Sequence, residues 1–383
     1  MKSIKDVTVQ DKRVLLRADL DIPIENGTIV DDTRIKAALE TIKYLLKRKA
    51  KVIIAGHLGR PDGKINEDLR MLPVAARLSR LLKKPVNYQL DCIGNFIEQA
   101  SRELNNGQIM LLENIRFHKE EEQNSKAFAK KLASLADIYV NDAFATSHRK
   151  HASIDAITYY LKGYAGLQFE KEVKTIKSIL KKPKNPYIAI IGGVKITTKI
   201  GAIKTLLKKV DAILLGGAMI FAFYKALGKE IGTSICDKDN ATLAKTLLKL
   251  GKKKIILPTD IMINTGKTVS VYNIPKNASG LDIGPETQQT YSEIIKKAKT
   301  IIWNGPMGKF EYKKFEKGTK TIAQAIAKSK ATSLVGGGNT EEAVKKFGLT
   351  NKYNHVSTGG GAMLELIEKE MLAGIKALER KNS

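Results

Sequence analysis

The segment YIAIIGGVKITTK at residues 187–199 indicates the fold of this 383-residue chain. A run of apolar, mostly β-branched residues leads into two glycines, and a helical pattern follows from Ile196 to Lys209. Similar runs recur along the chain, and most intervals between them carry helical patterns. Apolar strands that alternate with helices predict an α/β fold with doubly wound parallel sheets. The runs occupy residues 14–20, 51–57, 108–114, 137–143, 187–193, 211–217, 254–260, 300–306, 332–338 and 355–361.

The chain divides near residues 165–186. A helical segment, GLQFEKEVKTIKSIL, runs there into KKPKNP, whose two prolines stop a helix. The pattern predicts a first domain at residues 1–168, a helix and linker at 169–186 and a second domain from residue 187 onward.

The net charge of +27 allows any anionic partner, whether nucleic acid, membrane surface or phosphorylated metabolite. Lysine is spread along the chain, but 11 of the 12 arginines lie between Arg13 and Arg149. Clustered arginine favours a specific phosphate or carboxylate site. Cys92 and Cys236 match neither a disulfide framework nor a zinc spacing. The first residues lack an apolar signal core, and the longest uncharged apolar stretch (212–224) is too short to span a bilayer, so we expect a cytoplasmic protein without membrane association.

Cationic side chains follow several strands of the first half. RADLDIP places Arg17, Asp19 and Asp21 at alternate positions, which predicts one face of a strand. Three further loops, at residues 57–61, 113–118 and 147–151, each combine arginine with histidine. Because the carboxyl ends of parallel strands meet at one edge of a sheet, these loops predict a site for a small polyanion.

Glycine-rich turns follow the strands of the second half. Lys195 and Lys199 are four residues apart after Gly192-Gly193, so we expect both on one face of the first helical turn. The turns at 336–340 and 358–362 offer backbone N–H groups to phosphate. The two common nucleotide-binding motifs, G-x-G-x-x-G and Walker A, are absent from the sequence. The second half therefore predicts a nucleotide site of another type.

The sequence resembles the phosphoglycerate kinase family from about residue 4 to residue 378. The resemblance rests on ordered motifs: RADLDIP, HLGRP, ENIRFH, NDAFATSHRKHAS, GGVKITTKI, LLGGAMIF, DIGPET, IIWNGPMGKFE, GGGNTEEAV and HVSTGGGAMLELIE. It implies two Rossmann-like domains that face each other across a hinged cleft, with a hinge helix and linker at residues 169–186, the second domain at 187–364 and a C-terminal segment at 365–383 packed back on the first. It also implies reversible phosphoryl transfer between 1,3-bisphosphoglycerate and MgADP, giving 3-phosphoglycerate and MgATP, by a glycolytic, monomeric enzyme that uses Mg²⁺ and binds no nucleic acid.

The resemblance also implies a role for individual residues. The phosphoglycerate-binding positions are Asp19, Asp21, Arg34, His57, Leu58, Gly59, Arg60, Arg116 and Arg149. The nucleotide-binding positions are Gly193, Lys199, Gly217, Gly280, Asn304, Pro306, Glu311, Gly337, Gly338, Asn339 and Thr340. The catalytic groups are Arg34, Lys195, Lys199, Gly359 and Gly360, and Asn339 is the candidate for contact with Mg²⁺.

Two departures from the family pattern leave alternatives open. Asp21 stands where the family has Asn, which adds a negative charge beside an anionic substrate, and Asn339 stands where it has Asp, which removes a charge near the metal. A catalytically impaired homologue with a binding role is therefore one alternative. A basic nucleic-acid-binding protein is another, although only 6% of the residues are aromatic and the arginines lie at strand ends.

Overall fold

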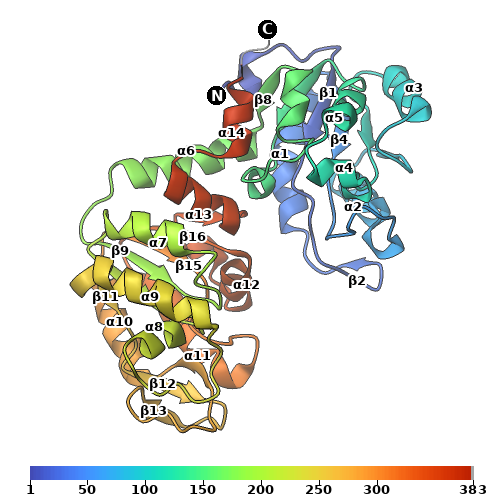
Figure 1. The fold of residues 1–383 in the computed structure, drawn as a ribbon. Coiled ribbons are helices and arrows are strands. Elements are labelled where there is room, and N and C mark those ends of the chain that lie inside the picture. Colours follow the sequence, from blue (N-terminus) through green and yellow to red (C-terminus); the bar gives the residue numbers. More distant parts are fainter. Residues whose placement is uncertain (381–383) are drawn as a thin grey trace. The chain divides into compact units, whose positions relative to one another are not determined.

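The computed structural model describes residues 1–380, so the last residues of the predicted C-terminal segment, 381–383, lie outside the described part. The chain forms two compact units (Figure 1). Unit 1 comprises residues 1–174 and the described residues from 371 onward, and unit 2 comprises residues 175–370. The division falls inside one helix, α6 (Leu167–Lys181).

Unit 1 is built on a parallel sheet with the strand order β5-β6-β4-β1-β7-β8. Its strands are β1 (Arg13–Arg17), β4 (Lys51–Ala55), β5 (Asn87–Tyr88), β6 (Ile109–Leu111), β7 (Ile138–Asn141) and β8 (Gly163–Ala165), with a hairpin of β2 (Ile24–Glu25) and β3 (Thr28–Ile29). The α-helices are α1 (Thr33–Lys47), α2 (Leu72–Leu82), α3 (Asn95–Glu103), α4 (Lys119–Glu122), α5 (Lys126–Ala133) and α14 (Ala373–Leu378). Short 3₁₀ turns are η1 (Ile4–Asp6), η2 (Glu67–Leu69), η3 (Ile115–Phe117), η4 (Phe144–Thr146) and η5 (Ala156–Tyr159).

Unit 2 repeats this architecture with the parallel order β11-β10-β9-β15-β16-β17. Its main strands are β9 (Tyr187–Ile191), β10 (Ala212–Leu215), β11 (Ile255–Ile256), β15 (Thr300–Asn304), β16 (Thr332–Gly336) and β17 (His355–Ser357). A small antiparallel sheet contains β12 (Asp260–Ile263), β13 (Thr268–Ser270) and β14 (Gly280–Ile283). The helices are α7 (Ile200–Leu207), α8 (Ile220–Ala226), α9 (Lys238–Gly251), α10 (Pro285–Lys297), α11 (Lys317–Lys328), α12 (Gly338–Lys346) and α13 (Gly360–Lys369), with 3₁₀ turns η6 (Lys252–Lys254), η7 (Lys313–Phe315) and η8 (Thr350–Lys352).

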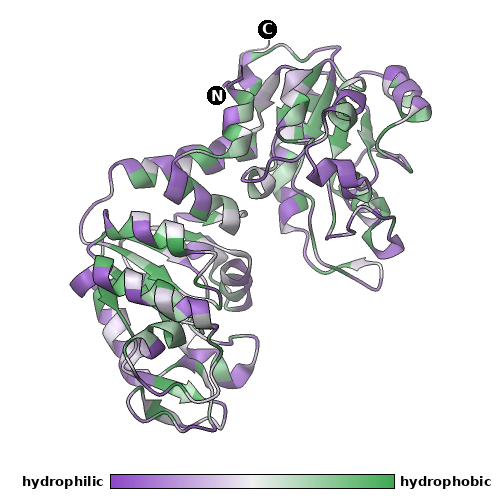
Figure 2. Cartoon of the chain, in the orientation of Figure 1, coloured by the Kyte–Doolittle hydropathy of each residue, from purple (hydrophilic) through white to green (hydrophobic). Residues whose placement is uncertain are grey.

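The predicted parallel α/β sheets are confirmed. Each of the ten apolar runs contains a strand, and the central strands are buried along nearly their whole length, as β9 and β15 show. Figure 2 shows these strands as hydrophobic, with hydrophilic residues gathered on the helices around them. Burial on both faces of a sheet requires continuous apolar sequence, which is the pattern that identified the strands.

One strand prediction is partly wrong. The run 254–260 gives only the short β11 to the main sheet, and Asp260 begins β12 in the small antiparallel sheet. Pro258 lies between the two strands and has no N–H to donate to a ladder. Asp260 accepts hydrogen bonds from the backbone N–H groups of Glu286 and Thr287 at the start of α10, so its role is structural.

The helix after β9 begins later than predicted. The sequence favours a start at Ile196, but α7 begins at Ile200 and residues 197–199 form a turn. Thr198 explains the delay, because its hydroxyl donates to the carbonyl of Lys195 at 3.0 Å and so competes with the helical pattern. Lys195 and Lys199 therefore do not share the first turn of a helix.

Both ends of the described chain contribute to unit 1. Helix α14 packs against β8, and the backbone N–H of Gly374 donates to the carbonyl of Ser147 at 2.8 Å. Arg380 donates to the carbonyl of Asp155 at 3.0 Å and to the hydroxyl of Thr158 at 2.6 Å. The first unit is therefore closed by residues from the far end of the sequence.

Candidate active site

An acidic pair and an arginine form the first part of the site in unit 1. The predicted strand face is wrong here: β1 ends at Arg17, because its neighbours β4 and β7 end at the same level, so Asp19 and Asp21 lie in the following loop. Arg34, in the first turn of α1, donates to Oδ1 of Asp19 at 3.2 Å and lies 3.9 Å from Oδ2 of Asp21. Oδ2 of Asp19 is buried without a hydrogen-bond partner among residues 1–380, and burial raises the pKa of this carboxyl group. A buried acceptor of this kind is available to a ligand hydroxyl.

His57 follows β4 and is only 3% exposed. Its Nδ1 lies 3.0 Å from NH2 of Arg17, and its Nε2 lies 3.7 Å from Oδ2 of Asp21. Burial holds the pKa of His57 well below its ordinary value, and the cations Arg17 and Arg116 lower it further. The ring is therefore neutral at pH 7.

The loop after His57 connects two predicted substrate residues. Gly59 has a φ of 58°, a left-handed conformation that favours glycine. Its N–H donates to Oδ1 of Asp21 and its carbonyl accepts from NH1 of Arg116, both at 2.8 Å. Leu58 is buried and Arg60 is exposed, so within this loop Arg60 alone presents its side chain to solvent.

Two further guanidinium groups, of Arg116 and Arg149, lie close together. Burial lowers the pKa of Arg116, and the nearby Arg17 and Arg149 lower it further. Nε of Arg116 lies 3.2 Å from Oε1 of Glu122, which offsets part of this repulsion. Arginine stays protonated at any physiological pH, so the cluster is an excess of fixed positive charge suited to a phosphate.

In unit 2, Lys199 lies at the point where the strand order reverses. Chain connections run from β9 toward β10 on one side and from β15 toward β16 on the other. The Lys199 ammonium group donates to the carbonyl of Gly192 at 2.7 Å and to Oδ1 of Asn304 at 2.6 Å, and so joins the ends of β9 and β15. Burial lowers its pKa to about 8. Ligands of doubly wound sheets bind at this switch point. Lys195, in contrast, is exposed.

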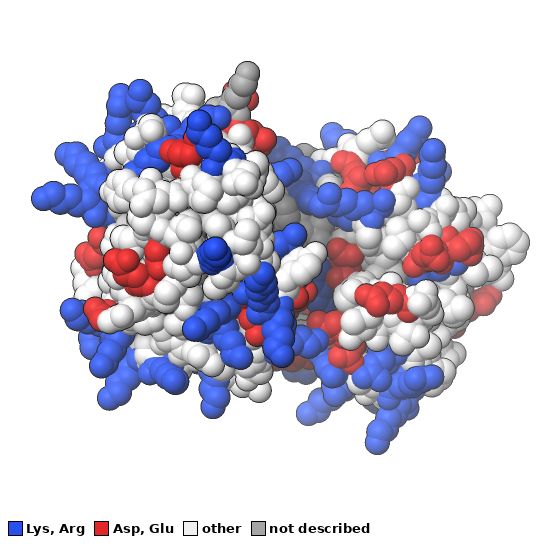
Figure 3. All heavy atoms as spheres, turned by 90° about the horizontal axis from the view of Figure 1, so that it is seen from below, with Lys and Arg blue, Asp and Glu red and all other residues white. Residues whose placement is uncertain are grey.

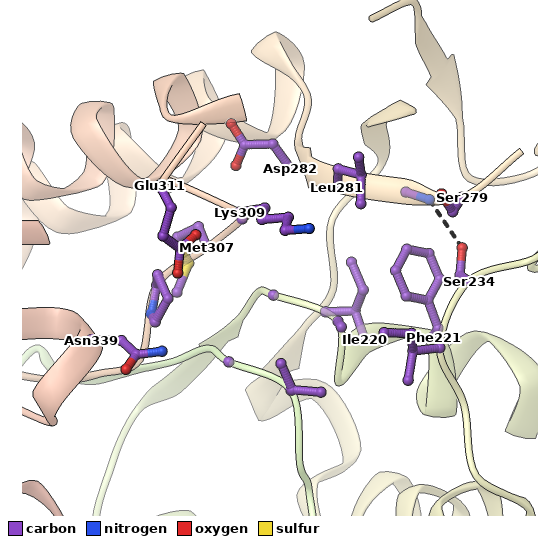
Figure 4. A pocket seen from close by; sticks show the side chains of 18 of the residues that line it. Ile220, Phe221, Ser234, Ser279, Leu281, Asp282, Met307, Lys309, Glu311 and Asn339 are labelled. Atoms are coloured by element: carbon purple, nitrogen blue, oxygen red, sulfur yellow. Dashed lines mark hydrogen bonds between the residues drawn. The ribbon is translucent and has the colours of Figure 1, made fainter. Parts of the chain in front are cut away.

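A cavity of about 340 Å³ lies beside this point, within the size range of small-ligand sites. It is lined by the predicted nucleotide residues Gly193, Gly217, Gly280, Pro306, Glu311 and Asn339, among others. Figure 4 shows Glu311, Lys309 and Asn339 on one side of it and Ile220, Phe221 and Leu281 on the other. The sequence reading missed the apolar wall, which includes Ile220, Phe221, Leu281 and Met307. The apolar segment that follows Gly217 in the sequence could have indicated this wall.

The glycine turns bring two helix N-termini together. Gly337 precedes α12 with a φ of 115°, and a Cβ added to Gly360 would lie only 2.2 Å from Cα of Gly337. Gly359 is the N-cap of α13, and open space surrounds the Cβ position of Gly338. Converging N–H groups at two helix starts favour a phosphate.

Two of the predicted nucleotide residues also hold the framework of this site. The buried Thr340 hydroxyl accepts from the backbone N–H of Gly305 at 2.7 Å. The Asn304 amide donates to the carbonyl of Gly336 at 2.7 Å. In unit 1, Asn114 plays a comparable part, since its amide donates to the carbonyl of Leu58 at 2.8 Å. The sequence did not show this contact.

Figure 3 shows Lys and Arg scattered over the visible face with Asp and Glu among them. Within residues 1–380, no helix has both the length and the apolar content needed to cross a membrane.

These features define a class. Two Rossmann-like units, one with clustered guanidinium groups and one with a pocket beside paired helix N-termini, are the parts of a phosphotransferase for a metabolite and a nucleotide. A family model described as phosphoglycerate kinase matches residues 4–370. The chain belongs to the phosphoglycerate kinase family.

Individual relatives agree with this assignment. A phosphoglycerate kinase from Dictyoglomus turgidum is 49% identical over 389 residues, covering 99% of this chain and 98% of the relative. One from a Picosynechococcus species is 48% identical, covering 99% of both. The solved phosphoglycerate kinase of Coxiella burnetii has a TM-score of 0.85 at 38% identity, covering 100% of this chain and 99% of that one. That of Pyrococcus horikoshii has a TM-score of 0.89 at 33% identity, covering 99% and 98%.

Proposed function

We propose that this glycolytic enzyme transfers a phosphoryl group reversibly between 1,3-bisphosphoglycerate and MgADP, giving 3-phosphoglycerate and MgATP. The single observation that carries the proposal is the pairing of a guanidinium cluster in unit 1 with a nucleotide-sized pocket in unit 2, in a chain of this family. Family membership and full-length relatives favour an active kinase over an impaired homologue or a nucleic-acid-binding protein.

Unit 1 binds the phosphoglycerate in this proposal. Arg116 and Arg149 neutralise its phosphate, with the exposed Arg60 at the edge of the site. The unpartnered oxygen of Asp19 accepts from the substrate hydroxyl, and Arg34 faces the carboxyl group that gives or receives the phosphoryl group.

Unit 2 binds the nucleotide. The base enters the apolar part of the pocket, and Glu311 accepts from ribose hydroxyls. The phosphates lie at the N-termini of α12 and α13, where Lys195, Lys199 and the N–H groups of Gly359 and Gly360 neutralise the transferring group. Both exchanging oxygens belong to anions, so no general base is needed and catalysis consists of positioning and charge neutralisation.

Magnesium enters with the nucleotide as part of the substrate. Asn339, the second residue of α12, lies in the pocket and offers a neutral amide oxygen. Such a ligand suits Mg²⁺ but adds no charge, so the nucleotide phosphates supply most of the binding.

The hinge belongs to the proposal too. Direct transfer requires donor and acceptor to meet with water excluded, so we infer closure about residues 169–186, which include most of α6. We further propose that the enzyme is a cytoplasmic monomer.

A coupled assay with 3-phosphoglycerate and MgATP tests the function. The purified chain should turn over, and Arg34→Gln should lose on the order of 100-fold or more in kcat, as expected for loss of a charged group that stabilises the transition state. Arg102→Gln is the matched control, because Arg102 pairs with Glu98 on the exposed helix α3. Binding of both substrates without turnover would instead support the impaired homologue.

A further inference from the structure

Behind the substrate site lies a buried cation that the proposed mechanism does not use. Arg17 is the last residue of β1 and is fully buried. Its guanidinium group donates to the hydroxyl of Ser153 at 2.9 Å and to the carbonyl of Ala18 at 2.6 Å, and NH2 lies 3.0 Å from Nδ1 of His57. The Ser153 hydroxyl donates in turn, at 2.6 Å, to Glu121, which is also fully buried.

The contact between Arg17 and His57 determines which ring nitrogen carries the proton. A guanidinium group has donors and no acceptor, so Nδ1 of His57 must be the acceptor. A neutral ring with an unprotonated Nδ1 carries its single proton on Nε2. Nε2 lies on the side of the ring that faces Oδ2 of Asp21, at 3.7 Å.

The surroundings of His57 oppose a second proton on the ring. Besides burial, the groups that lower the pKa of His57 are three guanidinium groups, of Arg17, Arg116 and Arg34, and the ring of His151. Asp21 is the acidic neighbour, 3.7 Å from Nε2. An imidazolium here would add another cation to the guanidinium cluster and would lose the Nδ1 acceptor that Arg17 needs.

We propose that Arg17 is a positioning residue that fixes the tautomer of His57, so that Nε2–H is a neutral, directed donor to an oxygen of the bound phosphoglycerate. This inference rests on the proposed function. The other tautomer would turn a lone pair toward an anionic oxygen and repel it. The link through Ser153 to Glu121 holds the guanidinium plane in place, so its NH2 group stays directed at Nδ1 of His57.

The test measures the protonation state of His57 by ¹⁵N NMR of histidine-labelled protein from pH 5 to 8. The variant His57→Asn assigns the signal. In the wild-type chain the Nε2–H tautomer should persist throughout. In Arg17→Gln, His57 should become a mixture of tautomers and titrate within this range. The KM for 3-phosphoglycerate should rise on the order of tenfold, while the KM for MgATP stays unchanged.

Arg13→Gln is the matched control, because Arg13 lies at the other end of β1 and pairs with Asp137. It should weaken folding without changing the His57 signal. Arg17→Lys retains a cationic donor and should recover part of the Nε2–H population.

Two results would overturn the role of Arg17. One is a wild-type His57 protonated at Nδ1, a measurement that does not depend on whether any variant folds. The other is a folded Arg17→Gln chain with an unchanged His57 signal and an unchanged KM. Lack of turnover by the wild-type chain would count against the proposed function instead, since the NMR signal is read without catalysis.

Discussion

The ammonium nitrogen of Lys199 lies 2.6 Å from the side-chain oxygen of Asn304. Every acceptor that it contacts there, including the carbonyl of Gly192, is neutral. Because none of these acceptors is a carboxylate, the positive charge of Lys199 is not offset by them and can interact with an incoming phosphate. Burial has already removed much of the water around the ammonium group.

The first prediction is that nucleotide binding takes up a proton near pH 8. Burial lowers the pKa of Lys199 to about 8, and a phosphate beside it would raise this pKa by stabilising the charged form. Affinity for ADP should therefore fall as the pH rises above 8. Calorimetry in two buffers with different ionisation enthalpies measures the uptake. Lys199→Met should abolish it, and Lys204→Met, on the exposed side of α7, should leave it intact.

The second prediction concerns magnesium. Asn339→Asp adds a carboxylate in the pocket, and one added charge contact in a solvated site is worth about 1 kcal/mol, or about fivefold in affinity. The Mg²⁺ concentration for half-maximal activity should fall by about that factor. The exposed Asn351→Asp is the control. An unchanged titration for Asn339→Asp would contradict the role given to this position.

The third prediction addresses the acidic loop. Asp21→Asn keeps an oxygen that can accept from the N–H of Gly59, yet removes a negative charge from the anion site. The KM for 3-phosphoglycerate should fall by about threefold to fivefold, with the larger effect at low salt. Asp68→Asn, in the exposed turn η2, should have no effect. A rise in KM would show that the charge of Asp21 assists binding, for example by orienting Arg34.

The fourth prediction tests the support of Arg149. A Cβ at Gly374 would lie 2.7 Å from both Cβ and Oγ of Ser147, so Gly374→Ala must displace the loop that continues into Arg149. Overpacking of this kind costs about 1–3 kcal/mol, which urea unfolding would detect. The KM for 3-phosphoglycerate should rise as well. Lys376→Ala, on the exposed side of α14, should change neither quantity.

The strands were predictable because their signal is local. The five residues of β9 are all buried, and the apolar run that shows this is contiguous in the sequence. The turn after it was also evident, since two glycines follow. The two-residue strand β5 and the three-residue strand β8 escaped detection, because each becomes a strand only through its neighbour in the sheet.

The site was predictable in its composition but not in its contacts. Residues at strand ends were identifiable, and His57 is one of them. The partner of His57, Arg17, lies 40 residues earlier, and no pattern in the sequence shows which donor reaches Nδ1. The position of the Lys199 ammonium group depends similarly on Asn304, 105 residues away. Tertiary packing decides both relationships.

The docking of α14 on β8 has a consequence for the order in which the chain can fold during synthesis. Unit 2 is a continuous segment, residues 175–370, and is complete once these residues have left the ribosome. Unit 1 is synthesised first, yet it lacks α14 until the residues that follow unit 2 have been made. The last step in folding unit 1 must therefore follow the synthesis of all of unit 2, and residues 1–174 that have left the ribosome without α14 would leave uncovered the part of β8 that α14 contacts.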